Sequence, residues 1–460
     1  MFDTAEGPVR AVLVAVQLPD VDAVAFRSSV AELGRLARTL GVEVAGEVVQ
    51  RRAALHPGTV LGKGKIAELR RMVGGGEAGE AGEGAEDGDE DEEQNEDGEE
   101  KEVGEAVRGE VQAVLVDHEL TPSQARNLEK LTGVEVMDRT SVILEIFRRH
   151  SRSRAAKAQV EIVRLQYLVP RLREQGKGRD RQRGGIGGKG AGESSLELDR
   201  RKIRDRIAEL GREIESMAEE QRTQRARRRD MSRVALCGYT NAGKSTLMRA
   251  LTGSEVYVAD KLFATLDTTV RTLVPPARPR ILVSDTVGFI DKLPHGLVAS
   301  FKSTLDETLE AGLLAHVVDA SDPGFERQLQ VTVEILDEIG AGEVPRMLIF
   351  NKVDRVGDGS SEEAARAALL ARWPDAVVMS ARREADVAAL RERLIAFFAR
   401  DLVEGEVLLP YDRQSLRGEI FAVCDVLEER YEDDGIHVRV RAHPSSLERL
   451  ARLVAGTVSA

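Results

Sequence analysis

The sequence predicts an α/β protein with four parts: an N-terminal α/β domain, a long helical hairpin, a central domain with a mostly parallel sheet and a small C-terminal α+β domain. Two observations lead to this fold class. Short apolar runs followed by loops and helical patterns recur in the N-terminal and central parts, as expected for strands of parallel sheets. Between these parts, apolar residues spaced 4, 3, 4 and 3 form the a/d seam of a coiled-coil arm: Ile203, Ile207, Leu210, Ile214 and Met217. We therefore expect domains at 1–140, 141–231, 232–400 and 401–460.

The N-terminal domain is expected to contain strands at 11–16, 42–49 and 113–116. We expect helices at 28–40, at 61–73, opened by residues 61–65, and after Thr121, which has the character of an N-cap. An insertion at 74–109 interrupts the pattern, because residues 77–105 hold sixteen Asp and Glu, one Lys and almost no large apolar side chain. Such a segment cannot bury enough surface to fold, so we expect a disordered, solvated insertion. The alternative is a mimic of nucleic-acid charge.

The hairpin is predicted to have a first arm at about 141–169, which ends at Pro170, and a glycine-rich tip at 184–193. Although the whole chain has a net charge of −13, residues 148–233 carry 25 Lys and Arg against 13 Asp and Glu. This excess favours a partner with a phosphate backbone. The alternative for the basic segment is a helix face on which the charges form ion pairs with one another. The alternative for the tip is a linker that only connects the two helices.

The central domain begins with a strand expected at 233–237, a glycine-rich loop and a helix expected at 246–251. The loop matches G-x-x-x-x-G-K-[ST], in which backbone amides and a helix N-terminus surround nucleotide phosphates. Lys244 should reach the β- and γ-phosphates, and the Ser245 hydroxyl should bind Mg²⁺. The residues expected at the phosphates are Gly238, Tyr239, Thr240, Asn241, Ala242, Gly243, Lys244 and Ser245.

A second motif follows the strand expected at 346–350: Asn351, Lys352, Val353 and Asp354. The Asp354 carboxylate can accept hydrogen bonds from guanine N1 and N2, whereas adenine would leave it unpaired. Asn351 suits the O6/N7 edge, and the Lys352 stem can lie over the base. After the apolar run at 376–379, Ser380 and Ala381 resemble the loop of Ras-like GTPases that offers a backbone amide to guanine O6. These motifs together predict a P-loop GTPase domain and argue against an ATP-driven helicase or kinase.

The switch elements are expected between and after these motifs. Asp285, Thr286, Val287 and Gly288 follow the strand expected at 281–284 and match D-x-x-G, in which Asp285 holds Mg²⁺ through water and the Gly288 amide senses the γ-phosphate. A threonine upstream should complete the Mg²⁺ shell; by chemistry alone, Thr265, Thr268 and Thr269 all qualify.

Phe289 occupies the position after D-x-x-G, where Ras-like enzymes place a glutamine that orients water. A phenyl ring cannot orient water, so intrinsic hydrolysis should be slow unless another group or a partner completes the site. The alternative, which is compatible with the first, is that Phe289 is a core residue.

The chain resembles the HflX family of ribosome-associated GTPases over nearly its whole length. The resemblance rests on residues 56–65, 119–129, 138–140, 143–147, 167–172, 184–193, 196–201 and 260–267. It implies that Thr265 joins Ser245 on Mg²⁺ and that Lys244, Thr265 and Gly288 act in hydrolysis. It also implies nucleotide contacts by Phe263, Ala264, Thr265, Leu266 and Asp267, and guanine contacts by Ser380, Ala381 and Arg382.

The same resemblance implies binding to the large ribosomal subunit and its RNA, through the N-terminal and helical parts. The implied roles are translation, ribosome splitting or rescue under stress, and ribosome biogenesis. The chain departs from the family pattern at 158–162, at 188–191 and in the acidic insertion.

Composition bounds the remaining alternatives. Cys237 and Cys424 are the only cysteines, so no disulfide framework or cysteine metal site is expected. We expect no membrane span, no signal peptide, a cytoplasmic location and a monomer. A GTPase that assists RNA modification or processing is the alternative function, and it would require a catalytic constellation outside the nucleotide site.

Overall fold

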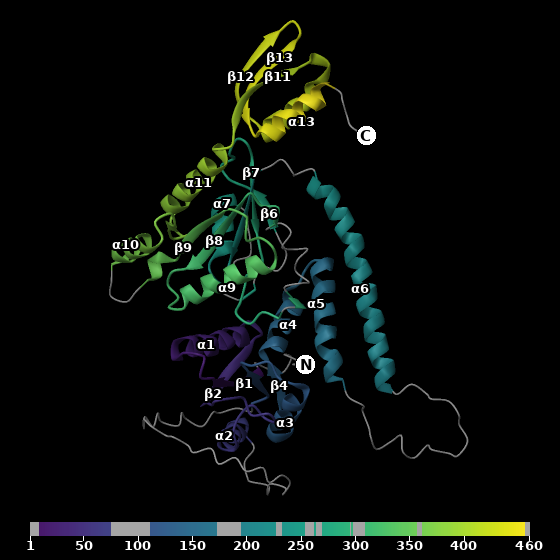
Figure 1. The fold of residues 1–460 in the computed structure, drawn as a ribbon, viewed down its shortest axis with the longest axis vertical. Coiled ribbons are helices and arrows are strands. Elements are labelled where there is room, and N and C mark those ends of the chain that lie inside the picture. Colours follow the sequence, from purple (N-terminus) through teal and green to yellow (C-terminus); the bar gives the residue numbers. More distant parts are fainter. Residues whose placement is uncertain are drawn as a thin grey trace, which may run out of the picture. The chain divides into compact units, whose positions relative to one another are not determined.

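The computed structural model describes residues 9–74, 111–172, 195–226, 232–253, 262–263, 269–294, 296–297, 309–356 and 361–455. The chain divides into two compact units, Met1–Glu145 and Ile146–Ala460, and each is described by itself (Figure 1). Three of the segments discussed above lie outside the described residues. They are the acidic insertion from residue 75 onward, for which disorder is expected, the glycine-rich tip, and residues 264–268. The described residues form three separate sheets, and the four-domain division stays a prediction.

The first unit contains a parallel four-stranded sheet of order β2-β1-β3-β4. Its strands are β1 Val9–Gln17, β2 Val42–Arg51, β3 Ala113–Val116 and β4 Glu135–Asp138. Its helices are α1 Ala23–Thr39, α2 Lys63–Val73 and α3 Pro122–Thr132. The three expected strands and three expected helices are confirmed, and Thr121 caps α3 in a reciprocal capping box with Gln124. The short strand β4 was not predicted.

Helix α1 begins five residues earlier than its apolar pattern indicated, because the Asp22 carboxylate caps it by accepting hydrogen bonds from the amides of Val24 and Ala25. At the end of β4, the buried Arg139 guanidinium forms ion pairs with two buried carboxylates, Glu32 of α1 and Asp117 after β3. This network joins three elements of the unit at the carboxyl edge of its sheet.

The first arm of the predicted hairpin is two helices, α4 Arg139–His150 and α5 Arg154–Leu168, so the single helix expected at about 141–169 was wrong. Two serine side chains explain the break. The Ser151 hydroxyl donates to the carbonyl of Phe147 at 2.6 Å, and the Ser153 hydroxyl caps α5 by accepting from the Ala156 amide at 3.1 Å. A short 3₁₀ turn, η2 Val169–Arg171, follows α5 and contains Pro170, as expected.

The second arm is the long helix α6 Ser195–Ala226. The predicted a/d seam is confirmed at Ile203, Ile207, Leu210 and Ile214. Leu210 is buried with Ala158 and Leu165 of α5, and the other three pack around them together with Ile162 of α5. The hairpin pairing is therefore an apolar contact between α5 and α6.

The second unit carries a six-stranded sheet of order β10-β9-β8-β5-β7-β6, in which only β6 is antiparallel to its neighbour. Its strands are β5 Ser232–Gly238, β6 Thr269–Thr272, β7 Ile281–Asp285, β8 Leu313–Asp319, β9 Arg346–Asn351 and β10 Val377–Val378. Its helices are α7 Lys244–Thr252, α9 Phe325–Glu338, α10 Glu362–Arg372 and α11 Glu384–Ala399. The mostly parallel α/β fold predicted for this part is confirmed.

Helices cover both faces of this sheet, which explains its nearly continuous apolar strands. On one face, Leu247 and Leu251 of α7 and Leu390 and Leu394 of α11 pack against the strands. On the other face, aromatic side chains of β9, α9 and the segment after α10 form a second cluster, which contains Phe350, Phe325 and Trp373. The sheet is thereby held rigid beneath the loops at its carboxyl edge.

The C-terminal part has an antiparallel sheet of order β11-β13-β12, with strands β11 Val403–Leu409, β12 Asp425–Glu432 and β13 Gly435–Ala442. Its helical elements are η5 Tyr411–Leu416, α12 Arg417–Val423 and α13 Pro444–Ala455. The strand expected at 436–441 and the helix after Pro444 are confirmed. The strand expected at 419–424 was wrong: it is mostly helix α12, because Ile420 and Val423, three residues apart, are buried on one helical face.

Candidate nucleotide-binding site

The residues predicted to bind nucleotide lie at the carboxyl ends of the parallel strands of the six-stranded sheet. Strand β5 ends at Gly238, β7 at Asp285, β8 at Asp319 and β9 at Asn351, and Ser380 lies just beyond β10. In open α/β sheets, this edge is where ligands bind, because the loops of neighbouring strands meet there. The topology therefore brings together four segments that are far apart in the chain: the glycine-rich loop, D-x-x-G, the Asn351–Asp354 motif and the loop at 380–382.

The glycine-rich loop joins β5 to α7 by a backbone path that excludes side chains at two positions. A Cβ at Gly238, whose φ is +142°, would lie 2.1 Å from the Val317 carbonyl oxygen. A Cβ at Gly243, whose φ is +98°, would lie 2.3 Å from Asn351 Nδ2. Both positions therefore require glycine.

Lys244 is buried at the first position of α7, and its ammonium group donates to two carbonyls of the loop. Its Nζ lies 3.0 Å from the Gly238 oxygen and 2.8 Å from the Tyr239 oxygen. An ammonium group has three donors, so one remains for an anion. Burial lowers the pKa of Lys244 to about 8, and the Asp285 carboxylate partly opposes this shift.

Two oxygen donors lie beside Lys244. The Ser245 hydroxyl donates to Asp285 Oδ2 at 2.8 Å, and the Asp285 side chain is fully buried. A hydroxyl and a carboxylate at a helix N-terminus are the oxygen ligands that Mg²⁺ uses together with phosphate. The residues present therefore fit a Mg²⁺-nucleotide. Thr265, the third expected Mg²⁺ residue, lies outside the described residues.

Asn351 connects three segments of the site. Its Nδ2 donates to the Ala242 carbonyl of the glycine-rich loop at 2.9 Å, and its Oδ1 accepts from the Ala381 amide at 2.9 Å. Asn351 is buried, and one Nδ2 hydrogen is left for a ligand. The sequence indicated only a base contact for Asn351, whereas the structure also makes it a tie between the phosphate and base loops.

The next residues of this motif differ in exposure. Lys352 adopts a left-handed conformation, with φ of +61°, and its Nζ forms an ion pair with Asp319 Oδ2 at 2.7 Å. Val353 is buried and Asp354 is exposed. The carboxylate predicted to recognise guanine is thus open to a ligand, while the motif around it is anchored in the protein.

The loop at 380–382 is held by two consecutive backbone amides. The Ser380 amide donates to Asp386 Oδ2 at 2.8 Å, and the Ala381 amide donates to Asn351. The Arg382 amide donates to the Ser380 hydroxyl at 3.3 Å. The predicted contact of the Ala381 amide with guanine O6 stays a prediction, since in this structure that amide donates to Asn351.

The D-x-x-G segment packs closely on the glycine-rich loop. The Thr286 hydroxyl donates to the Leu236 carbonyl at 2.7 Å, and Val287 is buried. A Cβ at Gly288 would lie 3.0 Å from Thr240 Cα and 3.1 Å from Lys244 Nζ. Gly288 therefore lies within reach of the groups expected at the γ-phosphate.

Phe289 is buried and bridges to the glycine-rich loop through its backbone. Its amide donates to the Gly238 carbonyl at 3.1 Å, and its carbonyl accepts from the Thr240 amide at 2.7 Å. The Tyr239 hydroxyl accepts from the Asp291 amide at 2.7 Å, which adds a second link. Phe289 is therefore a core residue, and its apolar ring supplies no group that could orient water.

Phe263 is the one residue of the expected 263–267 contact segment that lies within the described residues. It is buried, with φ of +57°, and its ring packs against Phe147 of α4 with the centroids 4.5 Å apart. Ala264, Thr265, Leu266 and Asp267 lie outside the described residues.

Several residues of the site were missed by the sequence-based prediction: Asp319, Arg366, Asp386 and Phe147. Each acts through a contact with an element distant in the chain, and none belongs to a nucleotide-binding motif. For Asp386, its position in the first turn of α11 was a signal, but such acidic residues are common as helix-dipole partners.

The two cysteine thiols are potentially reactive side chains outside the nucleotide motifs. Burial raises the pKa of Cys237 to about 12 and that of Cys424 to about 11, so both thiols stay protonated and unreactive at neutral pH. Over the ranges that the structure describes, no helix is long and apolar enough to cross a membrane.

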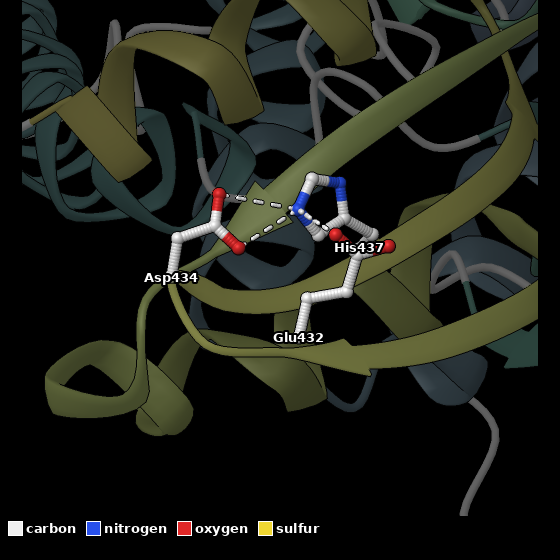
Figure 2. Close-up of side chains that lie close together, drawn as sticks. All are labelled: Glu432, Asp434 and His437. Atoms are coloured by element: carbon white, nitrogen blue, oxygen red, sulfur yellow. Dashed lines mark hydrogen bonds and ion pairs between the residues drawn. The ribbon is translucent and has the colours of Figure 1, made fainter.

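A cluster of two carboxylates and an imidazole lies at the hairpin between β12 and β13 (Figure 2). His437 Nε2 lies 3.1 Å from Asp434 and 3.8 Å from Glu432, and Nδ1 lies 2.9 Å from Glu406 of β11. A protonated imidazole satisfies these carboxylates without an ion, so we assign no metal to this exposed cluster.

The sheet order, the glycine-rich loop at the end of β5 and the Asn351–Asp354 motif at the end of β9 define a P-loop GTPase domain. Three family models match the chain. They are described as "GTP-binding GTPase N-terminal" at 27–80 and 94–148, "GTP-binding GTPase Middle Region" at 150–228 and "50S ribosome-binding GTPase" at 233–352.

Relatives described as "GTPase HflX" match nearly the whole chain. The protein from Gluconacetobacter diazotrophicus is 52% identical over 450 residues, which cover 97% of this chain and 98% of the relative. The protein from Escherichia coli is 35% identical over 462 residues, which cover 98% of each. The chain belongs to the HflX family of GTPases, and it binds and hydrolyses GTP.

Solved structures also resemble the chain. A GTP-binding protein from the archaeon Sulfolobus solfataricus in complex with GDP is 21% identical, with a TM-score of 0.41, and covers 85% of this chain and 99% of its own.

Proposed function

We propose that this GTPase is a GTP-switched factor that binds the large ribosomal subunit through ribosomal RNA, and that it acts in translation, ribosome splitting or rescue, or ribosome biogenesis. The observation that carries the proposal is the match of residues 233–352 to the family model described as "50S ribosome-binding GTPase". That range contains the glycine-rich loop, D-x-x-G and the first two residues of the guanine motif, Asn351 and Lys352. The proposed location is the cytoplasm, and the proposed free state is a monomer.

In this proposal the site divides into phosphate, magnesium and base parts. Residues 238–245 surround the phosphates and the remaining Lys244 donor binds them, while Ser245 and Thr265 hold Mg²⁺, with Asp285 acting through water. Bound Mg²⁺ neutralises charge on the phosphates. The segment at 263–267 and Gly288 lie at the γ-phosphate, and the residues at 351–354 and 380–382 recognise guanine.

Hydrolysis in this proposal depends on the partner. Lys244 and the Gly288 amide stabilise negative charge on the transferred phosphoryl group. The buried Phe289 ring supplies no general base or water-orienting group, so the chain positions the phosphate better than it positions water. The ribosome would then complete the site, and hydrolysis would release the ordered switch segments.

The hairpin supplies a surface suited to RNA. Arg200, Arg204 and Arg212 of α6 are exposed, and their charges favour a phosphate backbone. Other basic residues of α6 pair within the helix, as Arg206 does with Glu209 at 2.6 Å. In this proposal, the exposed arginines that are not paired in this way contact the RNA phosphates.

Pelleting of the protein with purified large subunits tests this proposal. A non-hydrolysable GTP analogue should give stronger association than GDP, and added subunits should raise the GTPase rate measured in the same tubes. Equal association in the two nucleotide states, or none, contradicts the proposal.

A charge variant of the arm tests where the RNA binds. Arg200→Gln with Arg204→Gln should weaken association and reduce its dependence on salt concentration, since each phosphate contact releases about one counterion. Arg372→Gln, which removes one exposed arginine from α10, is the matched control and should leave association unchanged. Equal effects of the two changes would show that the arm is not the binding face.

A further inference from the structure

The loop at 380–382 begins where the backbone pairing of the sheet ends. The strand before it, β10, is the edge strand and has only two residues, which pair with Ile349 and Phe350 of β9. Backbone bonds of Met379 with Phe350 and Val353 extend this pairing by one residue. Yet Ser380 is 1% exposed, and its amide must find an acceptor inside the protein.

Asp386 supplies that acceptor. It lies in the first turn of α11, and its Oδ2 accepts from the Ser380 amide at 2.8 Å and from Arg366 Nη2 at 2.8 Å. The carboxylate is therefore oriented by a cation while it holds the loop. The side chain is partly buried, which limits screening of this pair by solvent.

Arg366 connects the helices on either side of the loop. From α10, its guanidinium donates to the Val378 carbonyl at the end of β10, to Asp386, and to Glu362 Oε1 at 3.0 Å. A planar guanidinium with donors in fixed directions suits such a three-way contact. The end of β10, the start of α11 and α10 are thereby tied together around the loop.

We propose that Asp386, oriented by Arg366, is a positioning residue that holds the loop at 380–382 in the conformation that recognises guanine. Neither residue need touch the nucleotide. Asp386 fixes the Ser380 amide, which positions the loop, and on binding the Ala381 amide would exchange Asn351 Oδ1 for guanine O6. The inference rests on the proposed assignment of that loop to the base.

Nucleotide binding by variants tests the proposal. Asp386→Ala leaves the buried Ser380 amide without its acceptor, so only a fraction of molecules keep the loop in place, and the Kd for GTP should rise about tenfold. Asp386→Asn keeps an acceptor oxygen and should have a smaller effect. Arg366→Gln removes the orienting cation and should resemble Asp386→Asn.

The readouts separate positioning from general destabilisation. The ratio of GTP affinity to ATP affinity should fall, because adenine lacks the O6 that the loop is proposed to contact, while kcat at saturating GTP should stay unchanged. Arg372→Gln is the matched control, because Arg372 lies on the same helix but pairs with Glu326 of α9. It should leave both quantities unchanged.

Each outcome decides a separate point. An unchanged affinity ratio in both Asp386→Ala and Arg366→Gln overturns the positioning role. A wild-type protein with no preference for GTP over ATP overturns the assignment of the base site itself. If Asp386→Ala does not fold, Asp386→Asn and Arg366→Gln still give the same comparison.

Discussion

The buried ammonium group of Lys244 should make nucleotide affinity fall with rising pH. In the free protein its pKa is about 8, because burial disfavours the charged form. Bound phosphates favour the charged form and should raise the pKa above that value. Above pH 8, nucleotide binding therefore requires Lys244 to take up a proton. Because protons become scarcer as the pH rises, the nucleotide affinity falls.

The magnitude follows from the pKa of the free protein. With a pKa of about 8, Lys244 is about nine-tenths protonated at pH 7 and about one-tenth protonated at pH 9. The affinity for GTP should therefore fall about tenfold between these pH values, equivalent to about 1.4 kcal/mol. Equilibrium titration with a fluorescent GTP analogue at several pH values measures this change.

A non-titrating variant isolates the contribution of Lys244. Lys244→Arg keeps the positive charge, but its guanidinium stays protonated throughout this range. Its GTP affinity should be lower overall but should lack the tenfold dependence, and any slope that remains reports other groups, including the base. If wild type and variant show the same slope between pH 7 and 9, the role of burial at Lys244 is refuted.

Three further changes have defined outcomes. Asp354→Asn should shift the preference from GTP toward XTP, because the hydrogen-bonding pattern of the exposed side chain inverts; unchanged GTP affinity would refute the assignment. Leu210→Ala should destabilise the α5–α6 contact by about 2 kcal/mol, detected by faster amide exchange in α6, with exposed Arg212→Ala as the control. Hydrogen bonds from His437 to Asp434 and Glu406 raise the pKa of His437. The protonated imidazole therefore stabilises the β12–β13 hairpin fully below about pH 6.5, and this stabilisation is lost as the pH rises through the raised pKa. His437→Gln should remove that pH dependence of amide exchange in β13; an unchanged profile would show that other groups cause it.

Most strands and helices of the sheets could be predicted from the sequence, because their apolar periodicity is local. The errors occurred where local patterns were ambiguous. The break between α4 and α5 depends on two serine hydroxyls that bond the backbone. Residues 419–423 belong to helix α12 although the short apolar run at 419–424 also suits a strand. In both places, side-chain hydrogen bonds or burial decided between conformations that the pattern alone could not separate.

The nucleotide class was determined by the sequence itself, because the glycine-rich loop and the Asn351–Asp354 motif are short strings whose residue types carry the chemistry. Tertiary structure decided how those strings are held. Asn351 reaches Ala242, 109 residues away in the chain, and Lys352 reaches Asp319, 33 residues away. Arg366 and Asp386 meet only because α10 and α11 flank the same short strand. Such contacts depend on which strand ends lie side by side, and that order is a property of the folded sheet rather than of any segment of the chain.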